Sequence, residues 1–595
     1  MSLSRRQFIA GSLAAAVVGG AKGADAPAGP AANEMATDVL VAGGGLGGVA
    51  GALAALRLGR KVILTEETAW LGGQATTQGV PLDEHPWIES YGGTRGYREF
   101  RTRVRELYRR TYPLTPEAWS DPTLNPGAGW VSALSFEPRS GLAALGDMLA
   151  PYQAKGSLVI LRRHRPIAAA MEGDRCRAVT FQDLATGDRR VIAAGMVLDA
   201  TELGELLPLA GVEHVVGAES RAETGEPNAL EGAADPGDQM AFTHVFALDY
   251  RPGEEHVIDR PGKYEFWRSQ KNARTGKPVL ALNDLFAVEQ DFFGQKPRPG
   301  HYNFSPWAFR RMLCRDNFAA GAFPSDVTVA IWGQNEYHHG VLLGVPEAEA
   351  QRHREAARQQ SLSLIYWLQT EAPNLLENRT GFPGLRPRGD VFGTKDGLAP
   401  YPYIRESRRI RAEFTVLEQH FRTDLVATRH GPVKYPDSVG LSGYRIDIHK
   451  AAKSGQSMTL DNFGKHWRQQ IPLGALLPVR VENLLPAAKN LGVTAVTNGA
   501  FRVHPTEWNI GEAAGALAAH CLNRGLAPRH VRAAPARLAD FQRELAAQGF
   551  ELDWPGLETA QSYHSHHYYL SPPGADWYYG EAKRLRRPTS VRPIS

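Results

Sequence analysis

Residues 38–66, DVLVAGGGLGGVAGALAALRLGRKVILTE, constrain the fold of this chain more than any other segment. The apolar run 39–42 is typical of a buried strand, and a glycine turn of the form GxGxxG follows it directly. Small residues at 49–58 predict a closely packed helix, and residues 61–65 predict a second strand that ends at Glu66. This order of elements predicts a parallel βαβ unit that holds a dinucleotide.

Each glycine of the turn has a separate physical task. Gly43 permits the sharp turn, Gly45 lets the backbone approach a pyrophosphate, and Gly48 lets the helix pack on the strand. The helix N-terminus offers unpaired N–H groups that suit a diphosphate. Glu66 follows at the distance expected of a carboxylate that accepts ribose hydroxyls. The alternative is a glycine turn in an ordinary α/β protein.

The chain has 595 residues, which suggests two to four domains. A hydrophobic content of 43% and a charged content of 22% are those of a globular protein. The net charge of +4 gives no reason to expect a nucleic-acid partner. Three widely separated cysteines have no metal-ligand spacing, and we expect them to be buried thiols rather than a disulfide framework.

The first 26 residues have the three parts of a twin-arginine signal peptide. Arg5 and Arg6 precede a short h-region at 9–20, and small residues at 24–26 offer a cleavage site. The alternative is a chance arginine pair near an apolar start. We expect the twin-arginine export machinery to carry the protein to the periplasm, with no stable membrane span, because 12 apolar residues are too short to cross a bilayer.

Export also bears on the cofactor. A diffusible nicotinamide pool is not expected in the periplasm, so a tightly held flavin dinucleotide fits better than NAD. A polar, flexible segment, WLGGQATTQG at 70–79, follows Glu66 and allows backbone to lie against a ligand.

Further along the chain the periodicity changes. Short β-prone runs at 158–200 predict an antiparallel meander, and 96–108 predicts a helix with Arg101, Arg103 and Arg105 in solvent. Residues 346–370 predict a long amphipathic helix whose apolar face packs in the core. A helix with a closely packed N-terminus is expected from Pro505.

These observations predict an α/β fold. A Rossmann-like FAD-binding domain, with a parallel sheet plus an antiparallel β-meander, surrounds an inserted α+β substrate or cap domain. The expected parts are a signal peptide at 1–26, a linker at 27–35, the first part of the FAD-binding domain at 36–215, the cap at 216–470, the returning part at 471–525 and an extension at 526–595.

Three segments together resemble the FAD-dependent oxidoreductase family, which is related to the flavoprotein subunits of fumarate reductase and succinate dehydrogenase. They are the glycine turn, WLGGQATTQG, and the returning segment NLLPAAKNLG…GAFRVHPTEWNIGEAAG. The resemblance implies non-covalent FAD. The expected cofactor-binding residues are Gly43, Gly45, Leu46, Gly47, Gly48, Glu66, Gly72, Gly73, Gln74, Asn509, Ile510 and Gly511. At 487–489 the sequence lacks the Gly-Asp or Gly-Arg of many relatives, so no ribitol ligand is assigned there.

His504 is the first candidate for a catalytic base, because it precedes the expected flavin-contacting turn and flavin dehydrogenation requires a proton acceptor. The alternative is a histidine that packs or caps this loop. Arg502 is the candidate for holding a substrate carboxylate or hydroxyl, and its alternative is an ion pair with Glu507 or Glu512.

Arg405 and Arg409 are two further catalytic candidates, from a charge-rich run that a solvated surface also explains. Tyr444, Asp447 and His449 predict either a proton relay or, more simply, a hydrogen-bond network that supports the cap. The histidine pair at 338–339 and the three histidines within 564–567 lack accompanying ligands, so no metal site is expected.

The sequence therefore predicts an exported FAD-dependent dehydrogenase or oxidase. It would transfer hydride from a small polar organic substrate to non-covalent FAD and pass electrons to oxygen, a quinone or a redox protein. The alternatives are an NAD(P)H-dependent flavin reductase, for which a second dinucleotide unit is missing, and a non-catalytic flavin-binding protein.

Overall fold

The computed structural model describes residues 33–554, apart from residue 86 and residues 272–275, 283–291, 293–304, 375–376, 421–432 and 461–467. The predicted signal peptide, most of the predicted linker and the histidines at 564–567 lie outside the described residues. None of the described helices is long and apolar enough to cross a membrane.

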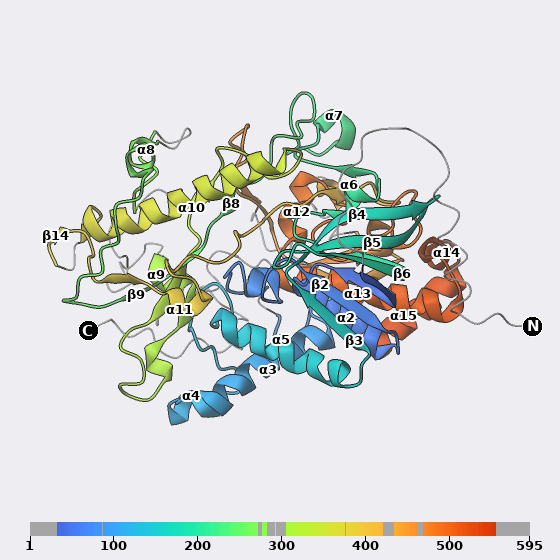
Figure 1. Cartoon of the computed structure of the whole chain (residues 1–595), viewed down its shortest axis with the longest axis horizontal. Coiled ribbons are helices and arrows are strands. Elements are labelled where there is room, and N and C mark those ends of the chain that lie inside the picture. The colour runs from blue at the N-terminus through green and yellow to red at the C-terminus, as the bar shows by residue number, and fades with distance from the viewer. Residues whose placement is uncertain are drawn as a thin grey trace, which may run out of the picture.

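A seven-stranded mixed sheet carries the glycine turn (Figure 1). Its order is β3-β2-β1-β6-β5-β4, and β21 pairs with the C-terminal half of β6. The β1, β2, β3, β6 and β21 pairings are parallel, whereas β4, β5 and β6 pair antiparallel. The strands are β1 (Asn33–Ala42), β2 (Val62–Glu66), β3 (Leu158–Arg162), β4 (His164–Glu172), β5 (Arg175–Asp183), β6 (Arg189–Asp199) and β21 (Leu484–Pro486). The predicted Rossmann-like sheet with a meander is confirmed.

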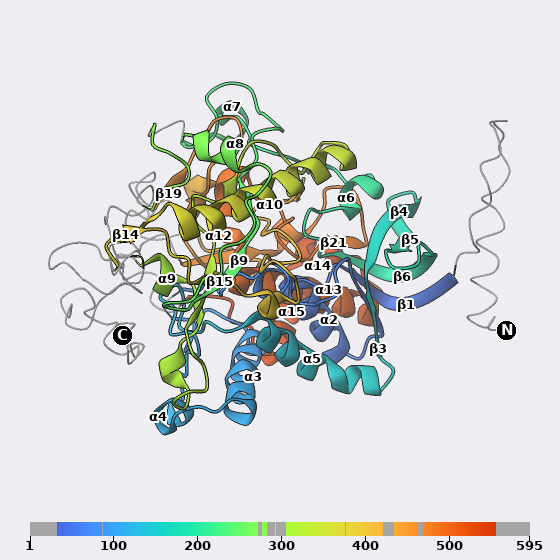
Figure 2. The same cartoon turned by 60° about the vertical axis from the view of Figure 1, so that its left-hand side comes forward.

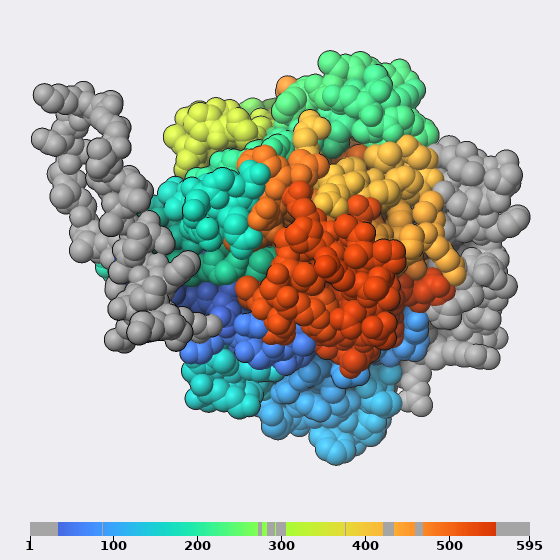
Figure 3. All heavy atoms as spheres, turned by 90° about the vertical axis from the view of Figure 1, so that its right-hand side faces the viewer, coloured from blue at the N-terminus to red at the C-terminus, as the bar shows by residue number. Residues whose placement is uncertain are grey.

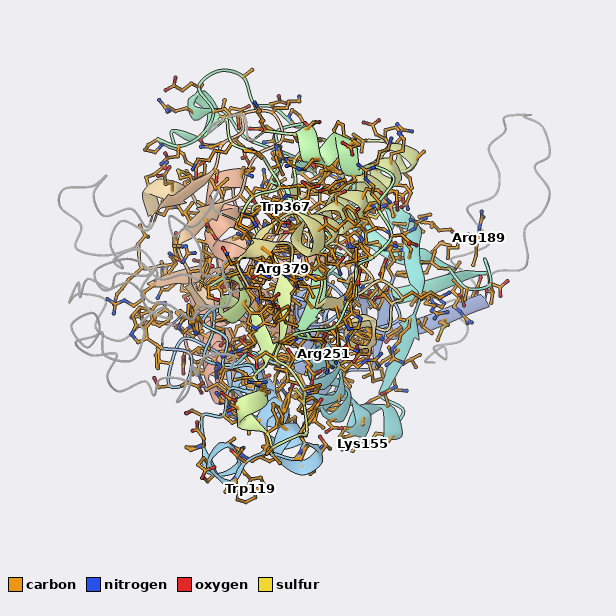
Figure 4. The ribbon with its side chains drawn as sticks, turned by 90° about the vertical axis from the view of Figure 1, so that its left-hand side faces the viewer. Trp119, Lys155, Arg189, Arg251, Trp367 and Arg379 are labelled. Atoms are coloured by element: carbon orange, nitrogen blue, oxygen red, sulfur yellow. The ribbon has the colours of Figure 1, made fainter. Side chains whose placement is uncertain are left out.

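Two details of the predicted meander are corrected. β3 is not part of it, because it pairs parallel to β2. The helix α5 (Pro138–Ala154) precedes β3 and provides the crossover that a parallel pairing requires. β6 is one continuous strand whose first half pairs with β5 and whose last residues pair with β21. Arg189, its first residue, lies at the outer rim of the molecule (Figure 4).

Both faces of β1 are buried over its last four residues, 39–42, which explains the continuous apolar run there. Val39 and Val41 belong to the core that includes helices α2 and α13, whereas Leu40 and Ala42 belong to a second core on the opposite face. Successive side chains of a strand point to opposite faces, so a strand between two cores has no polar positions to alternate.

The two ends of the described chain meet at helices α2 (Leu46–Arg57) and α13 (His504–Arg524). A Cβ on Gly511 would lie 1.9 Å from the Gly47 carbonyl oxygen, and one on Gly515 would lie 2.0 Å from the Gly51 carbonyl oxygen. Only glycine permits this approach of two helix backbones. Figure 3 shows C-terminal residues in orange and red beside the blue N-terminal segment.

The middle of the chain forms a second, antiparallel sheet of order β10-β11-β9-β15. Helix α10 (Glu347–Thr370) packs beside it and confirms the predicted amphipathic helix (Figures 1 and 2). Leu364, Ile365 and Trp367 are buried, as expected of a core-facing stripe. The domain bounds remain predictions; the core that holds Val39 also includes Met240. The second sheet consists of β9 (Phe246–Tyr250), β10 (Arg311–Leu313), β11 (Val327–Ala330) and β15 (Leu385–Pro387).

Short elements join these layers. The helices are α3 (Arg95–Thr111), α4 (Pro116–Ser120), α6 (Leu206–Leu209), α7 (Arg221–Thr224), α8 (Tyr264–Ser269), α9 (Pro306–Phe309), α11 (Gly389–Phe392), α12 (Ala495–Phe501), α14 (Pro528–Ala533) and α15 (Pro535–Ala547). The strands are β7 (His214–Val215), β8 (Phe242–Thr243), β12 (Glu336–Tyr337), β13 (Pro373–Asn374), β14 (Arg379–Thr380), β16 (Arg409–Ile410), β17 (Ser438–Gly443), β18 (Ile446–Ile448), β19 (Met458–Leu460) and β20 (Arg468–Pro472).

The prediction of solvated arginines on α3 is wrong for two of them. Arg101 and Arg105 are buried. Arg101 donates to Glu84 at 2.9 Å and 3.2 Å, and both arginines donate to Glu89. The acids lie on the loop before α3, so the helix pattern alone could not reveal that the arginines anchor this loop. The three cysteines are free and buried, as expected.

Asp199, at the end of β6, makes the unfolding free energy depend on pH. Its side chain is fully buried, and burial raises its pKa from 3.8 to about 7. Because the folded state then binds the proton more tightly than the unfolded state, stability falls as the pH rises from about 4 to about 7. We expect Asp199→Asn, which keeps the acceptor for Thr201, to stabilise the protein at pH 7 by up to roughly 4 kcal/mol.

Urea unfolding between pH 4 and pH 8 measures this effect. The variant should have a flatter stability profile, with a residual slope because burial also raises the pKa of Glu226 to about 7. The exposed Asp188→Asn serves as the control and should leave the profile unchanged. If the unfolding free energy of Asp199→Asn depends on pH as steeply as that of wild type, the pKa of Asp199 is not raised in the folded protein.

Candidate active site

The turn after β1 places backbone N–H groups at the carboxyl edge of the parallel strands. Gly43 has a φ of +98°, and a Cβ there would lie 2.2 Å from the Ala200 carbonyl oxygen. A Cβ on Gly48 would lie 1.9 Å from the Gly43 carbonyl oxygen. Gly45 is the N-cap of α2, so the helix begins directly at the strand end. Gly43 and Gly48 have the roles expected from their spacing, and the approach of a pyrophosphate to Gly45 stays a prediction.

Two carboxylates meet the N–H groups of this turn. Glu66 accepts from the Gly44 N–H at 2.7 Å and from the Thr68 N–H at 2.8 Å. Glu507, from the first turn of α13, accepts from the Gly47 N–H at 3.3 Å. Burial raises the pKa of Glu66 above its ordinary value. The first turn of α2 therefore attracts negative charge, as a helix N-terminus should.

The second glycine loop joins this turn to the returning segment. Gly72 and Gly73 both have positive φ, +106° and +47°, and the Gly72 N–H donates to the Gly44 carbonyl oxygen at 2.7 Å. The Gln74 side chain donates to the Arg502 carbonyl oxygen at 3.0 Å and also to Glu507. Residues 72–74 thus connect the glycine turn to the start of α13.

A pocket opens beside the turn. Its wall includes Gly43, Glu66, Gly73, Thr201 and Tyr401. The wall therefore combines the ends of β1, β2 and β6 with the second glycine loop. This is the edge of an open α/β sheet at which ligands bind.

The three predicted residues of α13 differ in their surroundings. The Asn509 amide donates to the Leu441 carbonyl oxygen at 3.1 Å, and its Oδ1 has no hydrogen-bond partner among the described residues. Ile510 is fully buried, and Gly511 lies against Gly47 of α2. Gly511 therefore lies beside the glycine turn, whereas Asn509 faces the segment at 440–441.

Lys489 is a buried cation in the same region. Its Nζ lies 2.5 Å from Glu202 and 3.6 Å from Glu507. Burial opposes its charge, but the two glutamates and Tyr403 together raise its pKa above the ordinary value. No ligand was predicted at 487–489. The loop nevertheless places the charged side chain of Lys489 near the N-terminus of α2, because Glu507 contacts both Lys489 and the Gly47 N–H.

His504 is the first residue of α13 and is fully buried. Its Nδ1 accepts from the Asp83 N–H at 3.0 Å, so a neutral ring carries its proton on Nε2. Nε2 makes no hydrogen bond of standard geometry within the described ranges, although the Val80 carbonyl is close enough to favour a proton there. Burial lowers the pKa of His504 to about 4, so the ring is neutral at pH 7.

Arg502 pairs with other partners than those considered from the sequence. It donates to the Tyr403 hydroxyl at 2.6 Å and to the Asp447 carbonyl oxygen at 3.1 Å, and it lies 3.6 Å from the Asp447 carboxylate. Glu507 instead contacts Lys489, and Glu512 pairs with Arg57.

Arg405 belongs to the same cluster. It lies over the Tyr403 ring at 4.7 Å and donates to Glu336 at 3.2 Å. His449 closes the circuit, because Nδ1 lies 2.5 Å from Glu336 and Nε2 lies 3.3 Å from Asp447. We call the six residues of this circuit the polar ring: Tyr403, Arg502, Asp447, His449, Glu336 and Arg405. The network interpretation of Asp447 and His449 has a structural basis here.

Arg409 lies in a separate ion-pair cluster. Its guanidinium is fully buried and donates to Glu406 at 2.6 Å and to Glu219 at 3.0 Å. Both acids line a second cavity that includes Met240 and Val496. In the part of the chain that the structure describes, there is no group of three His, Cys, Asp or Glu side chains that could hold a metal ion.

Comparison with known proteins decides the family. The pattern of the family described as FAD dependent oxidoreductase matches residues 38–545. The chain belongs to this family. FAD is therefore its cofactor, and the protein is an oxidoreductase. No curated protein matches significantly in sequence.

Solved structures with local similarity include other flavoenzymes. A myxobacterial FAD-dependent halogenase, CndH, is 19% identical over 38% of this chain and 46% of its own, with a TM-score of 0.20. Mycobacterium smegmatis Sdh1 is 10% identical over 37% and 41%, with a TM-score of 0.21. The flavin-dependent monooxygenase PieE is 13% identical over 37% and 36%, with a TM-score of 0.22. Each match spans less than half of the solved chain.

The residues present fit FAD. The pocket wall includes Glu66, whose carboxylate can accept hydrogen bonds from ribose hydroxyls, and the positive end of the α2 dipole suits a diphosphate. Gln74 Oε1, Gln78 Nε2 and Asn509 Oδ1 are buried polar atoms without hydrogen-bond partners between residues 33 and 554 as described. Such atoms require partners, and the polar edge of a flavin supplies donors and acceptors. When bound, the flavin supplies the two-electron chemistry.

Sequence reasoning missed three residues of this region. Tyr403, Lys489 and Glu336 contribute buried polar groups, and none belongs to the glycine motifs. Tyr403 lies two residues before Arg405, but the charge-rich run that follows drew attention to its arginines and not to the tyrosine. Glu336 is distant in sequence from every motif and had no detectable signal.

Proposed function

We propose that this protein is an exported dehydrogenase or oxidase that removes a hydride from a small polar organic molecule and transfers it to non-covalent FAD. The electrons then pass to oxygen, a quinone or a redox protein. A relationship to fumarate reductase and succinate dehydrogenase flavoproteins is part of the same proposal.

One observation supports the proposal above the others. Gln74, from the second glycine loop, contacts Arg502 of the polar ring at 3.0 Å. The residues that we expect to hold the cofactor therefore adjoin a buried group of arginine, tyrosine and acid side chains. Such groups bind polar substrates and move protons beside a flavin, whereas a protein that only stores FAD does not require them.

Anaerobic flavin bleaching tests this function. The purified holoenzyme is mixed with sugars, hydroxy acids, amino acids, amines, NADH and NADPH, and the flavin absorbance near 450 nm is followed. Bleaching by one class of organic substrate supports the proposal. Rapid bleaching by NADH or NADPH alone would instead support the flavin reductase, and bleaching by none would support a non-catalytic flavin protein.

Export is a separate prediction. We expect the double variant Arg5→Lys, Arg6→Lys to remain in the cytoplasm, because the export machinery recognises the twin-arginine pair. Cell fractionation and the mass of the N-terminus measure the outcome. Release of a shortened, FAD-containing wild type into the periplasm is expected, and equal release of the variant would contradict the prediction.

A further inference from the structure

Tyr403 occupies an unusual position in the polar ring. Its side chain is 2% exposed, and its hydroxyl oxygen accepts from Arg502 at 2.6 Å. The Arg405 guanidinium lies 4.7 Å from the centre of its ring. A buried phenol therefore has one cation at its oxygen and another at its ring face.

The segment that carries Tyr403 runs alongside the cofactor loop. The Tyr401 N–H donates to the Thr77 carbonyl oxygen at 3.2 Å, and the Ile404 N–H donates to Gln78 at 3.1 Å. Thr77 and Gln78 follow directly on the glycine loop at 72–74. Tyr403 is thus held between this loop and Arg502, on the cofactor side of the polar ring.

Both cations, Arg502 and Arg405, favour negative charge on the phenol oxygen, because opposite charges attract strongly at these short distances in a buried site. No acceptor for the Tyr403 hydroxyl proton lies within hydrogen-bonding distance among the described side chains of the ring.

The other titratable groups nearby are less suited to accept a proton. His504 carries its own proton on Nε2, because Nδ1 accepts from the Asp83 N–H. Although burial alone would raise the pKa of Asp447 and of Glu336, neighbouring cations hold both well below the ordinary value. Both carboxylates are therefore weak bases.

We propose that Tyr403 is the acid–base residue of the reaction, and that Arg502 at its oxygen and Arg405 at its ring face stabilise the phenolate form that receives the substrate proton. This inference rests on the proposed function. The phenolate oxygen takes the proton of the substrate O–H or N–H, and the hydride of the adjacent C–H bond passes with its two electrons to the oxidised flavin. A C=O or C=N double bond forms, and the phenolate becomes a phenol. Electrons and protons balance without a further reactant.

Tyr403→Phe tests this role by removing only the oxygen. The probe is the compound that bleaches the wild-type flavin fastest in the anaerobic panel. We expect bound FAD and the thermal midpoint to stay near those of wild type, and the bleaching rate to fall by about 10²-fold to 10⁴-fold, the usual effect of losing an acid–base group. Tyr264→Phe is the matched control, because its hydroxyl contacts Glu371 on the far side of the cap.

A second arm separates chemistry from structure. Site-specific incorporation of 3,5-difluorotyrosine at 403 makes the phenol more acidic with little change in shape. The pH dependence of bleaching should move to lower pH, which a purely structural tyrosine would not cause. An unmoved profile overturns the inference even if Tyr403→Phe fails to fold. If Tyr403→Phe bleaches as fast as wild type, only the inference is overturned and the proposed function stands. If wild type does not bleach with any compound, both the proposed function and the inference are overturned.

Discussion

Gly511→Ala is expected to lower the free energy of unfolding by about 3 kcal/mol or more and to release FAD. The added Cβ would lie 1.9 Å from the Gly47 carbonyl oxygen and 2.5 Å from the Gly47 Cα. These are backbone atoms of the first turn of α2, so no rotamer change can remove the clash. The helices must separate, and their separation displaces the N–H groups of the α2 N-terminus, where we expect the diphosphate to bind.

Urea unfolding followed by circular dichroism measures the stability, and the ratio of flavin to protein absorbance measures bound FAD. Gly146→Ala is the matched control, because Gly146 also lies within a helix, α5, but is exposed and has no neighbouring atoms within 4 Å of an added Cβ. It should be neutral or stabilise by about 1 kcal/mol through helix propensity. Equal effects of the two substitutions would show that the α2–α13 contact is not tightly fixed.

Arg409→Met is expected to destabilise the protein by about 3–5 kcal/mol, because it leaves buried carboxylates without their cation. The guanidinium contacts Glu406 at 2.6 Å and Glu219 at 3.0 Å. Arg409 is not part of the polar ring, so the bleaching rate per bound FAD should stay near that of wild type. The unfolding free energy should therefore fall while the bleaching rate stays the same. This combination distinguishes a structural arginine from a catalytic one.

Thermal and urea unfolding give the first measurement, and single-turnover bleaching gives the second. Arg411→Met is the control, since Arg411 lies two residues further on and is exposed. Adding Glu406→Gln to Arg409→Met should recover part of the stability, because one unpaired charge is removed. A large loss of bleaching rate at unchanged stability would instead assign Arg409 to catalysis, as the sequence first suggested.

Local patterns predicted the elements whose residues are close in sequence. The βαβ unit at 38–66 was recognisable because glycine spacing, strand burial and the acid after the second strand all act within 29 residues. The helix at 347–370 followed from its periodic apolar stripe. The parallel pairing of β3 was missed, because β-prone residues occur in both kinds of sheet and only the preceding crossover decides the direction.

The same limit applies to charged side chains. Arg101 and Arg105 have the spacing of a solvated helix face, yet the loop that contains Glu84 and Glu89 folds over them. A pattern within one helix does not show which partner covers it. Burial of a charge is decided by acids elsewhere in the chain, so it depends on the tertiary fold.

The sequence by itself predicted the cofactor class, which the family match supports, because the glycine turn and the acid after the second strand act through backbone geometry within one unit. Only the tertiary structure decided which side chains form the polar ring. The polar ring combines Glu336 of β12, Tyr403 and Arg405, Asp447 and His449, and Arg502 before α13. These segments are up to 166 residues apart, and their charges are stable in the interior only because the fold pairs them.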